Sequence, residues 1–74
     1  MNRDYYIECM TKYKSRLERK QKELADLKKK IMLSLDNNEP FFVIEPISKK
    51  CKQIEKDIAD INFDIEWAER HLSK

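Results

Sequence analysis

The chain has 74 residues and carries 16 Lys or Arg against 14 Asp or Glu, which gives a formal net charge of +2. A chain of this length forms one small domain with a limited core. It contains no Gly and only two Pro, and strong helix formers dominate, so the expected fold class is all-α. The lack of Gly excludes the glycine-rich loops of P-loop and dinucleotide-binding proteins.

The first predicted helix covers residues 3–36. Apolar side chains repeat through it at heptad spacing, and the two seam positions are filled by Met10, Leu17, Leu24 and Ile31 and by Tyr6, Tyr13, Lys20, Leu27 and Ser34. Asn37 or Asn38 is expected to adopt the left-handed conformation that ends a helix, and Pro40 prevents the helix from continuing. The seam predicts an amphipathic helix that needs a partner.

Part of this helix is basic. Residues 12–30 carry nine Lys or Arg and three acidic residues. A basic stripe with an aromatic residue is typical of a surface that contacts phosphates and stacks on a base. The candidate phosphate-binding residues are Lys12, Tyr13, Lys14, Arg16, Arg19, Lys20 and Lys22. The pI of about 8.5 is below that of most nucleic-acid-binding domains, so a solvated face with internal ion pairs is the competing interpretation.

Residues 37–46 are predicted to form the linker between two helices. Four consecutive apolar residues, 41–44, lie inside it between two prolines. Three roles are open for them. The first is to cap the end of a helical bundle. The second is to form a short strand across a dimer axis, since Phe, Val and Ile favour extended backbone. The third is to dock another protein, as long loops often do.

The second predicted helix covers residues 47–73. Its seam is unbroken, with steps of four and three residues throughout, and consists of Ile47, Cys51, Ile54, Ile58, Ile61, Ile65, Ala68 and Leu72. Residues 53–69 carry six acidic residues and one Lys, opposite in sign to the first helix. Two seams joined by a linker predict an antiparallel two-helix hairpin that resembles a coiled coil.

Flanking charges favour one register of this hairpin. If Leu27 lies opposite Ile58, three attractive pairs form: Lys14 with Glu69, Lys28 with Glu55, and Lys30 with Asp57. Glu23 and Asp64 then repel each other. A slide of one heptad leaves one attractive pair, Arg16 with Asp64, and two repulsive pairs, Glu23 with Asp57 and Lys30 with Lys50. Each exposed pair contributes only a few tenths of a kcal/mol. The first register is predicted on this balance.

The second helix also has apolar residues away from its seam. Ala59, Phe63 and Trp67 recur at every fourth position, and a two-helix hairpin cannot cover both sides of one helix. We therefore expect self-association, with a dimer that forms a four-helix bundle. The expected contacts with a second copy or another protein are Phe41, Phe42, Ile44, Ala59, Phe63 and Trp67.

The sequence lacks the patterns of common catalytic and metal sites. Cys9 and Cys51 lie at distant levels of the hairpin, which excludes a disulfide within the chain. His71 is the only histidine, beside Glu66 and Glu69, and no second segment completes a metal motif. We therefore predict no enzyme activity, no metal and no cofactor. No apolar segment precedes the first helix or spans a membrane, so a cytoplasmic location is predicted.

These features favour a non-enzymatic, homo-oligomeric interaction protein that acts as an adaptor or inhibitor by binding another protein. The alternative is binding of nucleic acid or an anionic nucleotide through the basic face of the first helix. The high content of Lys, Ile and Asn is typical of AT-rich bacterial and phage genomes.

Overall fold

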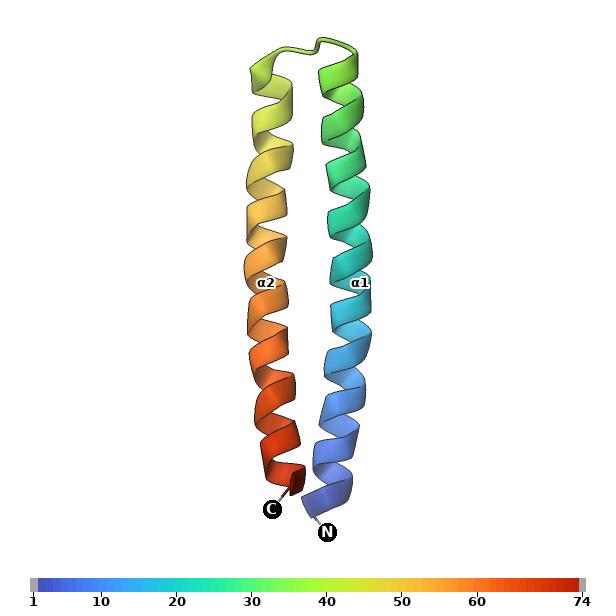
Figure 1. Ribbon diagram of the computed structural model, residues 1–74, viewed down its shortest axis with the longest axis vertical. Coiled ribbons are helices and arrows are strands. Elements are labelled where there is room, and N and C mark those ends of the chain that lie inside the picture. The colour runs from blue at the N-terminus through green and yellow to red at the C-terminus, as the bar shows by residue number, and fades with distance from the viewer. Residues whose placement is uncertain (1, 74) are drawn as a thin grey trace.

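The computed structural model describes residues 2–73. They form two long antiparallel helices, α1 (Asn2–Asp36) and α2 (Phe41–Ser73), which lie side by side and are joined by a short loop, so that both chain ends lie at the same end of the hairpin (Figure 1). The molecule measures 56 × 14 × 13 Å. The prediction of an all-α hairpin is confirmed. Neither helix has a stretch apolar and long enough to cross a lipid bilayer within these residues.

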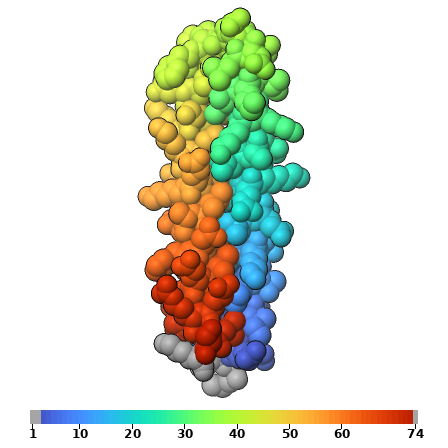
Figure 2. Space-filling view, in the orientation of Figure 1, coloured from blue at the N-terminus to red at the C-terminus, as the bar shows by residue number. Residues whose placement is uncertain are grey.

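The predicted seams form the contact between the helices. Every seam position of α2 is buried or half-buried, and Ile54 and Ala68 are only 2% and 0% exposed. The α1 seam residues are half-buried except Leu27 and Ser34, which are buried. Heptad spacing keeps these side chains on one side of each helix. In a space-filling view the helices touch along the rod, and long side chains project sideways from its middle (Figure 2).

The second helix begins six residues earlier than predicted. Residues 41–46, expected to belong to the linker, form the first turns of α2, and this excludes a strand at 41–44 within the hairpin. The Val43 N–H donates to the carbonyl oxygen of Pro40 at 3.0 Å, and Pro46 lies inside the helix. Ile44 continues the seam three residues before Ile47 and is 9% exposed. Burial of Ile44 offsets part of the cost of a proline inside a helix.

The end of α1 has the hydrogen bonds of a Schellman motif. The Glu39 N–H donates to the Ser34 carbonyl oxygen at 2.9 Å, and the Asn38 N–H donates to the Leu35 carbonyl oxygen at 3.1 Å. Asn38 has a φ of 55°, in the left-handed region that Asn tolerates better than most residues. The predicted role of Asn38 is confirmed, and Pro40 directs the chain into α2.

The register differs from the predicted one by a heptad. Leu27 clusters in the core with Cys51 and Ile54, and Ile47 also packs against this cluster. At the other end of the hairpin, the rings of Tyr6 and His71 are 5.0 Å apart. Both observations place Leu27 level with Cys51, seven residues from Ile58. The loop sets this register: it has four residues rather than ten, and exposed ion pairs are too weak to oppose the seam.

The ion pairs follow the observed register. Asp57 pairs with Lys20, at 3.4 Å from Nζ to Oδ2, rather than with the predicted Lys30. The predicted pair between Lys28 and Glu55 does form, at 3.8 Å, because both side chains are long enough to reach along the helix axis. Within residues 2–73 no ion pair joins the remaining predicted partners, Lys14 and Glu69.

The hairpin has a large surface for its mass. It exposes 6001 Å², whereas a compact monomer of 9.0 kDa exposes about 4,850 Å². Its radius of gyration of 16.8 Å compares with about 11 Å for a compact chain of this length. The elongated shape leaves much of each helix uncovered, including apolar side chains.

Candidate functional site

The exposed apolar side chains gather at the two ends of the rod. Six of the ten large ones lie beside the loop, and we call them the loop-end patch: Met32, Leu33, Leu35, Phe41, Phe42 and Val43. The other four lie toward the chain ends: Tyr5, Ile7, Phe63 and Trp67. The middle of the rod carries mainly charged residues. Apolar surface that the hairpin leaves uncovered is therefore concentrated, rather than scattered as single residues.

Helix geometry explains why the loop-end patch is exposed. Successive residues in a helix point about 100° apart, so Phe41, Phe42 and Val43 project in three directions. Phe41 and Phe42 are 72% and 74% exposed. Ile44 alone reaches the seam, which corrects its prediction as a contact with another molecule: the hairpin itself buries it. Phe41 and Phe42 remain accessible, as expected.

The chain-end half of the rod has an aromatic cluster. The ring of Tyr6 lies 5.4 Å from that of Trp67, edge to face, and the rings of Trp67 and His71 are 4.3 Å apart. His71 Nδ1 also lies 3.0 Å from the Trp67 carbonyl oxygen. Trp67 is 39% exposed, whereas Phe63, one turn earlier, is 66% exposed. Tyr6 thus covers part of the Trp67 indole, which the sequence pattern predicted to be exposed on the hairpin.

Other groups lie near this cluster. Tyr5 packs against Tyr6, with ring centroids 5.4 Å apart. A hydrogen bond with the Cys9 side chain, together with the charge of its thiolate, raises the pKa of Tyr5. An open hollow of about 780 Å³ beside Trp67 is lined by Glu66, Trp67, Glu69, Arg70, His71 and Ser73. The sequence signals for this cluster were Tyr6 at the last seam level and His71 beside Glu66 and Glu69.

A basic groove lies near the middle of the rod. It has a volume of about 390 Å³ and is lined by Arg16, Arg19, Lys20, Glu23 and Ile61. Three of the seven predicted phosphate-binding residues therefore meet in one place. Lys12, Lys14 and Lys22 are exposed outside this lining, and Tyr13 is half-buried in the seam.

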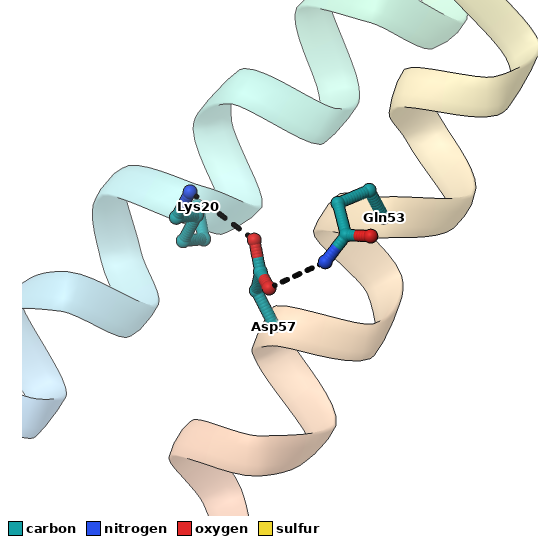
Figure 3. Close-up of polar contacts among 3 residues, drawn as sticks. All are labelled: Lys20, Gln53 and Asp57. Atoms are coloured by element: carbon teal, nitrogen blue, oxygen red, sulfur yellow. Dashed lines mark hydrogen bonds and ion pairs between the residues drawn. The ribbon is translucent and has the colours of Figure 1, made fainter.

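The charge of this groove is partly neutralised. Lys20 Nζ lies 3.4 Å from Asp57 Oδ2, and Gln53 donates from Nε2 to Asp57 Oδ1 at 3.1 Å (Figure 3). Asp57 thus binds one lysine from α1 and one amide from its own helix. Arg16 and Arg19 are exposed. The groove therefore offers two arginines to an anion, with Glu23 beside them.

The cysteines and potential metal ligands are dispersed. Cys9 is half-buried, Cys51 is buried in the core, and both are free thiols. In the part of the chain that the structure describes, no three His, Cys, Asp or Glu side chains converge as metal ligands would.

Three comparisons with known proteins complete this description. The chain matches no protein-family model, no curated protein and no solved structure.

Proposed function

We propose that this chain is a small, non-enzymatic cytoplasmic protein that assembles with itself and binds another protein as an adaptor or inhibitor. The observation that supports this proposal most strongly is the loop-end patch. Five of its members, Met32, Leu33, Leu35, Phe41 and Phe42, are each at least 59% exposed. Concentrated apolar surface of this kind marks interaction sites in small proteins.

The energetics of burial favour the same role. Burying a large apolar side chain completely stabilises by about 1.5–3 kcal/mol. Burial of several patch residues can therefore exceed the association cost of at least 4 kcal/mol. Phe41 is a suitable anchor because aromatic residues contribute strongly to interfaces.

Lysines near the patch indicate the chemistry of the partner. Six of them lie within a few turns of the loop: Lys28, Lys29, Lys30, Lys49, Lys50 and Lys52. Lys28 pairs with Glu55 and Lys49 with Glu45, but their side chains are still 59% and 76% exposed. All six lysines are therefore accessible to acidic groups. The proposed partner therefore has an apolar groove with an acidic rim.

Two aspartates in the patch should abolish binding to this partner. The variant Met32→Asp with Leu35→Asp places charges where apolar contact is expected, and we expect at least a tenfold loss of captured protein from a native lysate. The solution molar mass should not change. The matched control is Ala25→Asp, which adds a charge to an exposed position of α1 outside the patch. Equal capture by the patch variant and the control would contradict the proposal.

The basic groove favours a second candidate function, binding of nucleic acid or an anionic nucleotide. Arg16 and Arg19 are both exposed at the groove, and arginine forks suit phosphate oxygens. Lys20 can contribute only in competition with Asp57. The acidic residues of α2 limit the field around the groove.

This second function requires binding that weakens with salt. If it holds, single- or double-stranded oligonucleotides should bind at low ionic strength and lose affinity steeply as salt is added. Arg16→Gln with Arg19→Gln should reduce both the affinity and its salt dependence, whereas Lys52→Gln, which lies outside the groove, serves as the control. Absence of binding at low ionic strength would remove this candidate.

A further inference from the structure

Outside its seam, α2 carries a second row with heptad spacing, which faces away from α1 except at Trp67, whose indole contacts Tyr6. Its eight positions are Phe42, Pro46, Lys49, Gln53, Lys56, Asp60, Phe63 and Trp67. All eight are exposed in the hairpin. Each end of the row is apolar. Lys49 follows the apolar residues at one end, and Asp60 precedes those at the other. We call it the outer row.

We propose that the outer row binds the outer row of a second copy of this chain, with the two α2 helices antiparallel. This inference rests on the proposed self-assembly and specifies its geometry. In the register that we propose, Trp67 packs on Phe42 of the partner subunit, and Phe63 packs on Pro46 of the partner subunit. Asp60 then pairs with Lys49 of the partner subunit, and the two-fold axis repeats each contact.

The sequence of charges selects the antiparallel arrangement. If the two α2 helices were parallel and in register, Lys49 would face a second Lys49, and Asp60 would face a second Asp60. Like charges at such positions destabilise a helix pair. In the antiparallel register each of these residues meets an opposite charge. Lys56 then meets a neutral residue, Gln53 of the partner subunit.

The hairpin has enough accessible surface for such a dimer. The hairpin exposes about 1,150 Å² more than a compact monomer of its mass. A specific interface of standard size removes about 800 Å² from each partner. The proposed contact runs from residue 42 to residue 67, a length of about 38 Å along the helix. Most of the loop-end patch, including Phe41 and Leu35, stays free for another protein.

The fluorescence of the single tryptophan tests this arrangement. Phe42 and Trp67 lie about 38 Å apart within one chain, so a change at Phe42 reaches Trp67 only through a second copy. As the wild-type concentration is raised, we expect Trp67 emission to shift to shorter wavelength. Phe42→Glu should abolish this shift. The matched control Phe41→Glu alters the adjacent aromatic, which is equally exposed but outside the row, and should retain the shift.

A charge exchange supplies a second readout that does not depend on an aromatic residue. Lys49→Glu or Asp60→Lys alone should raise the dimer dissociation constant by about tenfold, because each creates two like-charge contacts. The double variant in one chain should restore wild-type affinity. Analytical ultracentrifugation measures these constants, and circular dichroism checks that each variant remains helical.

The outcomes separate this inference from the proposed function. The antiparallel contact is wrong if the protein dimerises but Phe42→Glu retains the shift in Trp67 emission. It is also wrong if the double charge variant does not restore the dimer dissociation constant. Either result leaves self-assembly intact. A chain that is monomeric at all concentrations overturns both the contact and the self-assembly. Loss of partner capture in the Met32 and Leu35 variant is independent of all these results.

Discussion

Ile54→Ala is expected to lower the free energy of unfolding by about 2–5 kcal/mol. Ile54 is 2% exposed and belongs to the core cluster with Leu27 and Cys51. Its truncation removes apolar contacts and leaves a cavity that two rigid helices cannot fully close. Chains of this length are stable by roughly 5 kcal/mol in total. The variant should therefore lose a large part of the stability of the hairpin.

Thermal unfolding followed by circular dichroism measures this effect. All samples need the same protein concentration, because self-assembly makes the midpoint concentration-dependent. The matched control is Ile7→Ala, which shortens an isoleucine that is 44% exposed. This control should lower the free energy of unfolding by less than about 1 kcal/mol. Equal losses in the two variants would show that the seam is not the main source of stability.

Ala68→Phe should destabilise the chain-end half of the hairpin by about 1–3 kcal/mol. Ala68 is 0% exposed, and close packing around a buried methyl group leaves little space for a larger side chain. A phenyl ring forces α1 and α2 apart near the level of Tyr6. The edge-to-face contact of Tyr6 with Trp67 should then be lost.

Two measurements check this prediction. Trp67 emission should shift to longer wavelength as the indole becomes more exposed, and the thermal midpoint should fall. Ala59→Phe introduces the same ring at an exposed alanine of the same helix and should change stability by no more than about 0.5 kcal/mol. An Ala68→Phe protein with unchanged emission and midpoint would contradict the close packing described above.

The candidate contacts show how far a residue pattern can identify a surface. Phe63, Phe41 and Phe42 fall off the seam, and the structure leaves them exposed as expected. The pattern failed for Ile44, because the predicted helix began too late to place this residue on the seam. It also missed the cover that Tyr6 and His71 provide for Trp67, since a contact between chain ends depends on the register of the hairpin.

The observed register shows why exposed ion pairs did not predict how the two helices align. The charge pairs counted from the sequence contribute a few tenths of a kcal/mol each. The extension of α2 back to Phe41 shortens the loop and buries Ile44, which contributes more than several such pairs. Of the three attractive pairs predicted, Lys28 with Glu55 survived because its side chains are flexible.

The two seams, the antiparallel hairpin and the left-handed residue at the turn could all be predicted from the residue pattern. These features follow from periodicity and backbone preferences, which act between residues near one another in the chain. The start of α2, the heptads that meet and the accessibility of Trp67 depend instead on how the two helices pack. Those outcomes depend on the balance between loop length, a proline inside a helix and the burial of one isoleucine. This balance depends on contacts between the two helices, so a local sequence pattern does not predict it.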